Sequence, residues 1–348
     1  MIEINGDLCH QTLVKNQKHA LAFNGDKDYA TWKAEVREKF LDLVGINAIK
    51  ENACPINVEI EEEVECEGYK RIRFVFESEV GSFVPCYLLV PSGEVKKRPV
   101  AITLQGHATG FHNSVAIPKY PGDEAYITRG DFAVQAVKQG FVALAIEQRA
   151  MGERKTKVHD PDPIRMCAFL SMMAIELGRT VVGERMWDVS KAIDALSYFD
   201  KYCDLDKILI TGNSGGGTMS FYAACLDARI KVSVPSCAFC SYEASIMNVY
   251  HCPCNFIPGI LKYFEMEDLS CLIAPRPLAI VTGGKDYLFP LDGVKKSYET
   301  VKKVYEKEGV KDNCRLVTTD MGHWWCKDII WDTVKQEVDK LGWKLREK

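Results

Sequence analysis

Length, composition and charge limit what this chain can be. Its 348 residues suffice for one large α/β domain with additions or for two ordinary domains. Hydrophobic residues make up 47% and charged residues 26%, and the net charge of −4 comes without a basic cluster, so nucleic acid and anionic membrane surfaces are not expected partners. No apolar run approaches the roughly 20 residues of a bilayer span. The first residues lack the basic start and apolar core of a signal peptide, so we expect a cytoplasmic protein.

The 14 cysteines do not have the pattern of a secreted disulfide framework, because the chain is long and several of them lie in apolar segments. The densest group combines Cys237 and Cys240 with His251, Cys252 and Cys254, and a zinc site is one interpretation of it. The single proline between the last two cysteines is poor spacing for a tetrahedral knuckle. We therefore expect buried reduced thiols, with no metal and no cofactor.

Residues 1–95 are predicted to form an N-terminal extension of a helix and antiparallel strands. Apolar side chains at helical spacing indicate an amphipathic helix from Tyr29 to Leu43, and Gly45 follows as its end. Three β-type stretches come next, the last two joined by a turn at 79–82: 58–66, 69–78 and 83–90. We expect these strands to join the main sheet.

Residues 96–348 are predicted to form an α/β domain. Short apolar runs (100–104, 141–146, 207–211, 230–234, 278–282 and 315–318) alternate with helical patterns (131–138, 186–196 and 294–305). This alternation predicts a mostly parallel central sheet with helices on both faces. Two segments, 150–184 and 241–272, do not fit. Each follows the carboxyl end of an expected strand, where open α/β sheets bind ligands, so both are expected to be cap or rim segments.

The sharpest motif is Gly212-Asn213-Ser214-Gly215-Gly216, which follows the apolar run 208–211 and precedes a helical stretch at 218–226. Gly-x-Ser-x-Gly between a strand and a helix is typical of a nucleophile elbow, a strained turn that exposes the serine hydroxyl. A phosphate loop would carry a lysine after its last glycine, and Gly217-Thr218 has none. The pattern predicts Ser214 as a nucleophile and the Gly215 amide as a donor to an oxyanion.

A serine nucleophile needs a general base, and in an elbow-bearing chain the base is a histidine that comes later in the sequence. Only His251 and His323 follow Ser214. His323 comes just after the last expected strand, so it is the predicted base. His251 lies in the irregular cysteine-rich segment and is expected to be a structural or rim residue.

The base in turn needs an orienting carboxylate. Asp286 follows the expected strand 278–282 on a glycine-containing loop, from which it can reach the imidazole of the next loop. Asp292 and Asp320 are the competing candidates. We expect Asp292 to cap the helix that begins near Gly293, and Asp320 to shape the histidine loop.

Other residues are predicted around this centre. A second oxyanion donor is expected after the strand 100–104, at the backbone amide of His107 or Ala108. Trp324 and Trp325 either shorten an acyl pocket or pack as part of a C-terminal helix. Arg149 is a candidate pocket residue, although a role in pinning its own loop is favoured.

The chain resembles the acetyl xylan esterase and cephalosporin-C deacetylase group, and dienelactone-hydrolase-like relatives, within the α/β-hydrolases. The matching pieces are Leu104-Gln105-Gly106-His107, Gln148-Arg149-Ala150-Met151-Gly152-Glu153, Gly212-Asn213-Ser214-Gly215-Gly216, Ile273-Ala274-Pro275-Arg276-Pro277, Gly283-Gly284-Lys285-Asp286 and Gly322-His323. It departs from the group at Gly215, where a glutamine is usual, and at Ala150, where a glycine is usual. The resemblance implies the α/β-hydrolase fold, the Ser–Asp–His triad and a homo-oligomer, of which a hexameric ring is one form.

These observations predict a serine carboxylester hydrolase that removes short acyl groups, such as acetyl, from a carbohydrate or similar small ester. A serine peptidase or amidase of the same fold is the first alternative, although residues 1–98 are too few for the propeller domain of prolyl peptidases. A noncatalytic binding protein is the second, and the presence of all three triad residue types argues against it. Dienelactone hydrolysis is not favoured, because that group typically uses cysteine as its nucleophile.

Overall fold

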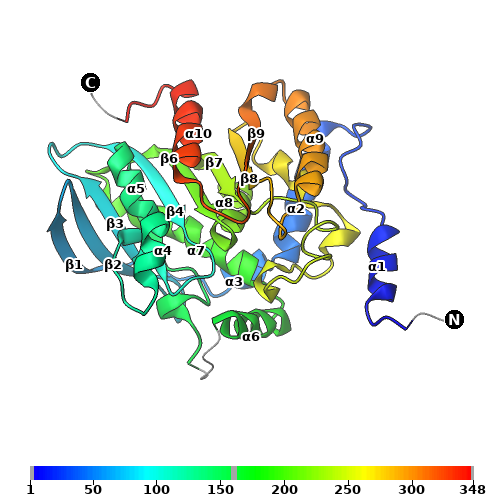
Figure 1. The fold of residues 1–348 in the computed structure, drawn as a ribbon, viewed down its shortest axis with the longest axis horizontal. Helices are drawn as coiled ribbons and strands as arrows, with labels where there is room; N and C mark the ends of the chain where they lie inside the picture. The colour runs from blue at the N-terminus through cyan, green and yellow to red at the C-terminus, as the bar shows by residue number, and fades with distance from the viewer. Residues whose placement is uncertain (1–3, 158–162, 346–348) are drawn as a thin grey trace.

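A nine-stranded sheet forms the centre of the molecule in the computed structural model, which describes residues 4–157 and 163–345 (Figure 1). The strands lie in the order β1-β2-β3-β5-β4-β6-β7-β8-β9. Their bounds are β1 (Val58–Cys66), β2 (Tyr69–Glu79), β3 (Ser82–Pro91), β4 (Arg98–Leu104), β5 (Val142–Ile146), β6 (Cys203–Asn213), β7 (Ile230–Ser236), β8 (Leu278–Gly283) and β9 (Cys314–Thr319). The strands from β5 to β9 in this order are parallel, which confirms the predicted fold class.

The first three strands pair antiparallel and join the parallel part where β3 meets β5. In β2 the apolar residues occupy alternate positions, and Ile72, Phe74 and Phe76 are therefore buried together on one face of the sheet. β1 is the edge strand and carries five glutamates, whose charges discourage further strands from adding to the sheet. The boundary expected near residue 95 falls between β3 and β4, and strands on both sides of it belong to one sheet.

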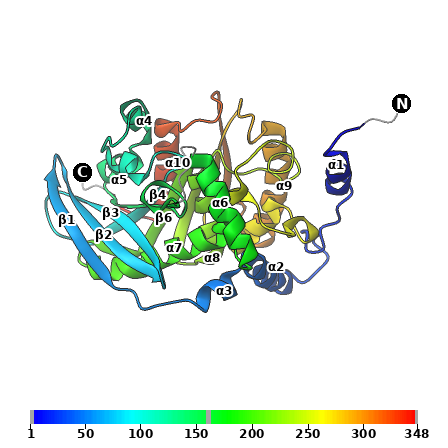
Figure 2. The same cartoon turned by 90° about the horizontal axis from the view of Figure 1, so that it is seen from below.

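Helices cover both faces of the sheet (Figure 2). One apolar core lies against α2 (Tyr29–Leu43), α3 (Ile46–Lys50), α7 (Val181–Ala195), α8 (Gly215–Leu226) and α9 (Leu291–Lys307). A second core, on the other face, lies against α5 (Phe132–Gln139) and α10 (Lys327–Lys340). Within the described ranges no single helix is both long and apolar enough to cross a membrane; one pair, 165–176 with 181–199, passes that test jointly and is bent by 94°.

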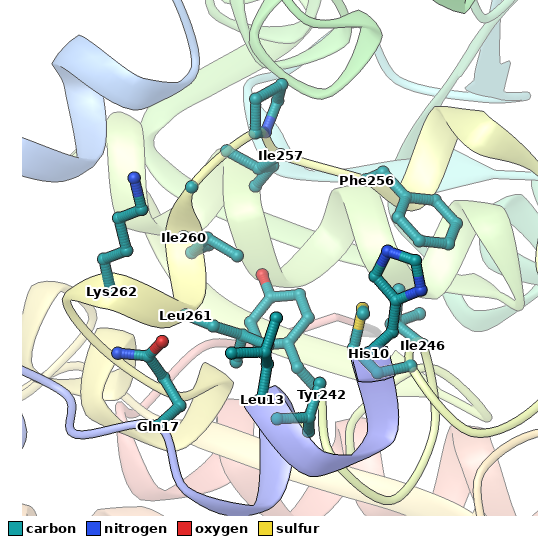
Figure 3. A pocket seen from close by; sticks show the side chains of 14 residues that line it. His10, Leu13, Gln17, Tyr242, Ile246, Phe256, Ile257, Ile260, Leu261 and Lys262 are labelled. Atoms are coloured by element: carbon teal, nitrogen blue, oxygen red, sulfur yellow. The ribbon is translucent and has the colours of Figure 1, made fainter. Parts of the chain in front are cut away.

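The two segments expected at the rim lie next to each other. The first contains α6 (Pro163–Glu176), and the second is built largely of short 3-10 turns, of which Pro253–Asn255 contacts α6. Helix α1 (Leu8–Lys15) lies at the edge of the molecule with none of its residues buried. Between α1 and residues 242–262 is an apolar cavity of about 540 Å³, which shares no lining residue with the cavity at Ser214 described below (Figure 3).

A buried ion cluster ties the β2–β3 hairpin to the loop after β5 and to α7. Arg149 Nη2 and Arg154 Nη1 each lie 2.7 Å from a different carboxylate oxygen of Asp188, and Arg149 Nη1 lies 2.7 Å from Glu79 Oε1. Burial alone would raise the pKa of Asp188, but the two guanidiniums hold it well below its ordinary value. Asp188 is therefore ionised and fixes two cations in the interior.

Replacing this carboxylate should be costly. In Asp188→Ala, Arg149 and Arg154 lose a shared buried anion. We therefore expect the free energy of unfolding, measured in urea, to fall by about 3–5 kcal/mol. Asp200→Ala, at an exposed position after the same helical segment, is the control and should change stability by less than about 0.5 kcal/mol. Equal stability of the two variants would contradict this account of the cluster.

Candidate active site

Ser214 lies on a sharp turn between β6 and α8. Its backbone has φ 55° and ψ −125°, a conformation that L-residues rarely adopt. Two hydrogen bonds hold the turn: the Ser214 amide donates to the Ser236 carbonyl on β7 (2.9 Å), and the Thr218 amide donates to the Ser214 carbonyl (2.8 Å). The strained turn expected of a nucleophile elbow is therefore present, and it places the side chain at the carboxyl edge of the sheet.

Two glycines make this turn sterically possible. A Cβ placed on either Gly212 or Gly216 would overlap the carbonyl oxygen of Leu104, at the end of the neighbouring strand β4. The loop after β4 is just as close, because a Cβ on Gly106 would lie 2.9 Å from the Cβ of Ser214. Backbone from β4 and β6 is thus in direct contact around the serine, and only glycine leaves room for this contact at positions 212 and 216.

His323 and Asp286 are hydrogen-bonded to each other at the ends of β9 and β8. His323 Nδ1 lies 2.8 Å from Asp286 Oδ2, and Asp286 Oδ1 accepts from the backbone amides of Leu288 (2.9 Å) and Phe289 (3.3 Å). An ionised carboxylate only accepts, so Nδ1 carries the proton and Nε2 remains free to act as a base. The Phe289 ring stacks on the imidazole at 5.9 Å between centroids and further limits its orientation.

Backbone bonds hold the two loops in register. The Gly284 amide donates to Thr319 (2.7 Å), and the Lys285 amide donates to Met321 (2.9 Å). A Cβ on Gly283 would overlap the carbonyl of Gly322, so the loops touch directly. The distance between the carboxylate and the imidazole is consequently set by the main chain.

Ser214 and His323 line one small cavity of about 180 Å³. Its other lining residues are Gly106, His107, Tyr126, Arg129, Gly130, Phe132, Asn213 and Trp325. The Gly215 amide begins α8, where the helix dipole favours negative charge, and it lies 3.4 Å from a Cβ built on Gly106. Of the two residues expected to supply a second oxyanion donor, His107 lines the cavity and Ala108 does not.

The cavity wall includes residues that the motifs did not indicate. Helix α4 (Asp123–Gly130) supplies Tyr126 and Arg129, and α5 supplies Phe132. No periodicity or spacing distinguishes α4 from an ordinary surface helix, so only the fold places it at the site. Arg129 also lies over the exposed Trp324 ring, at 3.5 Å from the ring centroid.

Of the three expected pocket residues, Trp325 lines the cavity, and Trp324 and Arg149 do not. Trp325 is buried, lines the cavity, packs on Phe132 at 4.3 Å between centroids, and donates from its indole to Gln135 (3.0 Å). Trp324 reaches the cavity only through Arg129. Arg149 is not among the lining residues, and its guanidinium belongs to the ion cluster with Asp188, which is the loop-pinning role.

The competing histidine and carboxylates do not line the cavity. His251 Nε2 is 3.1 Å from Ser245 Oγ, so it is engaged in its own segment. Asp320 is exposed. The prediction that Asp292 caps a helix is wrong, because α9 begins at Leu291 with Pro290 before it. Asp292 lies in the first turn, where its negative charge interacts favourably with the helix dipole without capping the helix.

A cysteine also lies near the imidazole. Cys237 has φ 48°, and its sulfur is 3.6 Å from the Trp324 carbonyl oxygen and close to both Asp286 and His323. Burial raises the pKa of Cys237 to about 12. The thiol is therefore protonated near neutral pH, and a protonated thiol is a poor nucleophile.

Glu147 anchors the loop that passes Ser214. It is fully buried after β5, and its oxygens accept from the amides of Phe111 (3.2 Å) and Glu153 (3.2 Å) and from Gln105 Nε2 (3.1 Å). Burial raises its pKa to about 7. The carboxyl group thus joins the loops after β4 and β5, the first of which carries Gly106.

Comparisons with known proteins bear on the family and the fold of this chain. The sequence profile of the Abhydrolase family matches residues 4–317, which is most of the chain. A Bacillus subtilis (strain 168) protein provisionally named the hydrolase YtaP is 30% identical over 203 residues, 57% of this chain. That alignment spans 64% of the relative, so the chain matches less than two thirds of its length.

Two solved structures are similar in fold. A Bacteroides fragilis protein provisionally named an acetyl xylan esterase has a TM-score of 0.73 at 18% identity, over 94% of this chain and 85% of its own. A glucuronoyl esterase from Solibacter usitatus has a TM-score of 0.65 at 17% identity, over 93% of this chain and 97% of its own. At these identities the likeness establishes the fold alone, and it confirms the α/β-hydrolase architecture.

The raised pKa of Glu147 predicts a pH dependence of stability. The pKa of Glu147 is about 7 in the folded chain against 4.5 for the free group. The stabilisation that the protonated carboxyl gives the folded state is therefore complete below about pH 4.5 and is lost as the pH rises through about 7. Glu147→Gln cannot titrate and should flatten the fall in Tm between about pH 5 and pH 8. Glu265 and Asp268, whose pKa values burial also raises to about 7, should preserve part of the slope.

The control for this measurement is Glu124→Gln, an exposed position on α4. It should retain the full wild-type dependence of Tm on pH. An unchanged slope in Glu147→Gln would show that Glu147 does not titrate in this range.

Proposed function

The chain belongs to the Abhydrolase family, and from this premise we propose that it is a serine carboxylester hydrolase that acts through an acyl-enzyme. The observation that carries the proposal is the bonded His323–Asp286 pair, which shares a small cavity with a serine on a strained elbow. A nucleophile, a base oriented by a carboxylate and convergent backbone donors are the parts that acyl transfer requires.

In this mechanism Ser214 Oγ attacks the ester carbonyl while His323 Nε2 takes its proton. Asp286 holds the imidazole in the required tautomer and stabilises the imidazolium that forms. The Gly215 amide and a backbone amide of the 106–108 loop donate hydrogen bonds to the carbonyl oxygen as it becomes negatively charged. His323 then returns the proton to the departing alcohol, and water repeats the sequence to release the acid.

The proposed substrates are short acyl esters, such as acetyl esters, of a carbohydrate or similar small alcohol. The cavity of about 180 Å³ is bounded by Phe132 and Trp325, which leaves little room for a long acyl chain. Tyr126 and Arg129 add polar groups to the same wall, and these suit a hydroxyl-rich alcohol. The names of the two similar structures, acetyl xylan esterase and glucuronoyl esterase, support a carbohydrate ester.

Two alternatives make different predictions. A peptidase or amidase of this fold would cleave a peptide amide at a rate comparable with that of the ester. A noncatalytic binding protein would turn over neither substrate. Parallel assays with p-nitrophenyl acetate and a peptide p-nitroanilide therefore separate the three possibilities.

We expect Ser214→Ala to abolish hydrolysis of p-nitrophenyl acetate, with a loss of at least about 10⁴-fold in kcat, because the variant has no hydroxyl to acylate. The measurement is steady-state release of p-nitrophenol. Ser197→Ala, at an exposed position outside the site, should keep wild-type activity. Full activity in Ser214→Ala would overturn the proposed nucleophile.

Trp325 is predicted to limit the length of the acyl group. Trp325→Ala should raise kcat/KM for p-nitrophenyl octanoate relative to the acetate by about tenfold, because it opens the cavity wall. Trp331→Ala is a matched control: both indoles donate to Gln135 Oε1, but only Trp325 lines the cavity. A similar shift in both variants would mean that loss of packing, and not pocket length, causes the change.

A further inference from the structure

Four potential metal ligands from three separate segments meet next to the cavity. They are His107 from the loop after β4, Cys167 from α6, and Cys252 and Cys254 from the second rim segment. All their ligand atoms lie within 4.8 Å of one another, and the three cysteines are buried. Each residue therefore offers one donor atom to a common point.

This group differs from the one that the sequence brings to attention. Cys240 lies apart, with its sulfur 3.8 Å from the Pro290 carbonyl oxygen, and Cys237 lies close to Asp286 and His323. His107 and Cys167 lie far from Cys252 in sequence, and only the fold unites them. The short spacing in Cys252-Pro253-Cys254 is no obstacle, because the two remaining ligands come from other segments.

The distance between the histidine and one of the cysteines matches tetrahedral zinc. With Zn–S of about 2.3 Å and Zn–N of about 2.0 Å, a tetrahedral centre places nitrogen and sulfur about 3.5 Å apart and two sulfurs about 3.8 Å apart. His107 Nε2 lies 3.5 Å from Cys254 Sγ. A Cys₃His set is also one of the closed donor sets typical of structural zinc sites.

A buried cation beside the cluster provides an independent argument. Arg185 is buried, and its guanidinium donates to the Arg149 carbonyl (2.7 and 2.9 Å) and to the sulfur of Cys167 (3.4 Å). Among the described residues no carboxylate pairs with it. Three neutral thiols would leave this charge uncompensated, which is costly in the interior. Three thiolates and a neutral imidazole around Zn²⁺ carry one net negative charge, which balances one guanidinium.

We propose that His107, Cys167, Cys252 and Cys254 bind one Zn²⁺ ion in a closed, four-coordinate site. The ion ties both rim segments to the loop after β4. Because Gly106 packs against Ser214 and His107 is the next residue, the site fixes the backbone that faces the nucleophile. The zinc positions this loop and the rim and has no open coordination position for substrate.

Metal content tests the site directly. The full chain, purified without chelators, should contain about one zinc per chain by mass spectrometry of the metal, and Cys167→Ser and Cys252→Ser should contain at least fivefold less. Cys240→Ser, at a buried cysteine just before the second rim segment and outside the zinc group, is the matched control and should retain the zinc. Ser214→Ala should also retain it, so the zinc site stands or falls separately from the proposed esterase activity.

Alkylation of the wild-type chain avoids variants that do not fold. With zinc bound, Cys167, Cys252 and Cys254 should react slowly with iodoacetamide, and a strong chelator should increase their alkylation by at least about tenfold while leaving that of Cys240 unchanged. Added Zn²⁺ should restore the protection. Replacement by Co²⁺ should give the sulfur-to-metal charge-transfer absorption of a tetrahedral thiolate site.

Three results would overturn the proposal. One is absence of bound metal from the chain together with failure to take up added Zn²⁺. Another is a disulfide between two of the three cysteines, found by peptide mapping under non-reducing conditions. The third is zinc that stays at full occupancy in both serine variants.

The positioning role has its own readout. Removal of zinc should lower the rate at which a fluorophosphonate labels Ser214 and lower kcat more than it raises KM, because the loop that carries Gly106 keeps Glu147 but loses its second anchor while the nucleophile remains. Added Zn²⁺ should restore both. Unchanged labelling of the zinc-free chain would show that the ion does not position the loop.

Discussion

The close contact of three backbone segments around Ser214 is the constraint on which the rest of the structure depends. β4, β6 and the start of α8 approach so closely that a single Cβ on Gly212 or Gly216 would overlap the Leu104 carbonyl. The serine there has a positive φ, and Gly106 packs against it. Ser214 and the loop that carries Gly106 are therefore fixed by the same packing.

Close backbone contact also builds the other half of the site, at the neighbouring strands β8 and β9 of the same sheet. Main-chain hydrogen bonds join the loops after β8 and β9, so the carboxylate of Asp286 reaches the imidazole of His323 without a long flexible side chain. Parallel strands bring all these ends to one edge, which explains how residues more than a hundred positions apart share one small cavity. Helix α4 forms part of the cavity wall, and we propose that zinc joins the segments 150–184 and 241–272 to the loop carrying His107.

The sequence could predict whatever depends on local pattern. Short apolar runs and helical spacing predicted the sheet and most of its helices, and the three predicted site residues, Ser214, Asp286 and His323, follow the ends of β6, β8 and β9. It could not place Tyr126 and Arg129, because α4 carries no periodicity that distinguishes a cavity wall from a surface. The cysteine cluster escaped for a related reason: Cys167 and His107 become neighbours of Cys252 only through tertiary folding. Asp292 was misplaced because the helix starts one residue before it, at Leu291.

The central claim is that Ser214 becomes acylated, and trapping that intermediate tests it most directly. The protein would be mixed rapidly with p-nitrophenyl acetate, quenched in acid within the first turnovers, digested and examined by mass spectrometry. The account predicts one acetyl group on the peptide that contains Ser214, and none on that peptide in Ser214→Ala. An acetyl group carried instead by Cys237 or His323 would contradict it. A burst of p-nitrophenol in the first turnover, with no acetyl group on the Ser214 peptide, would contradict it too.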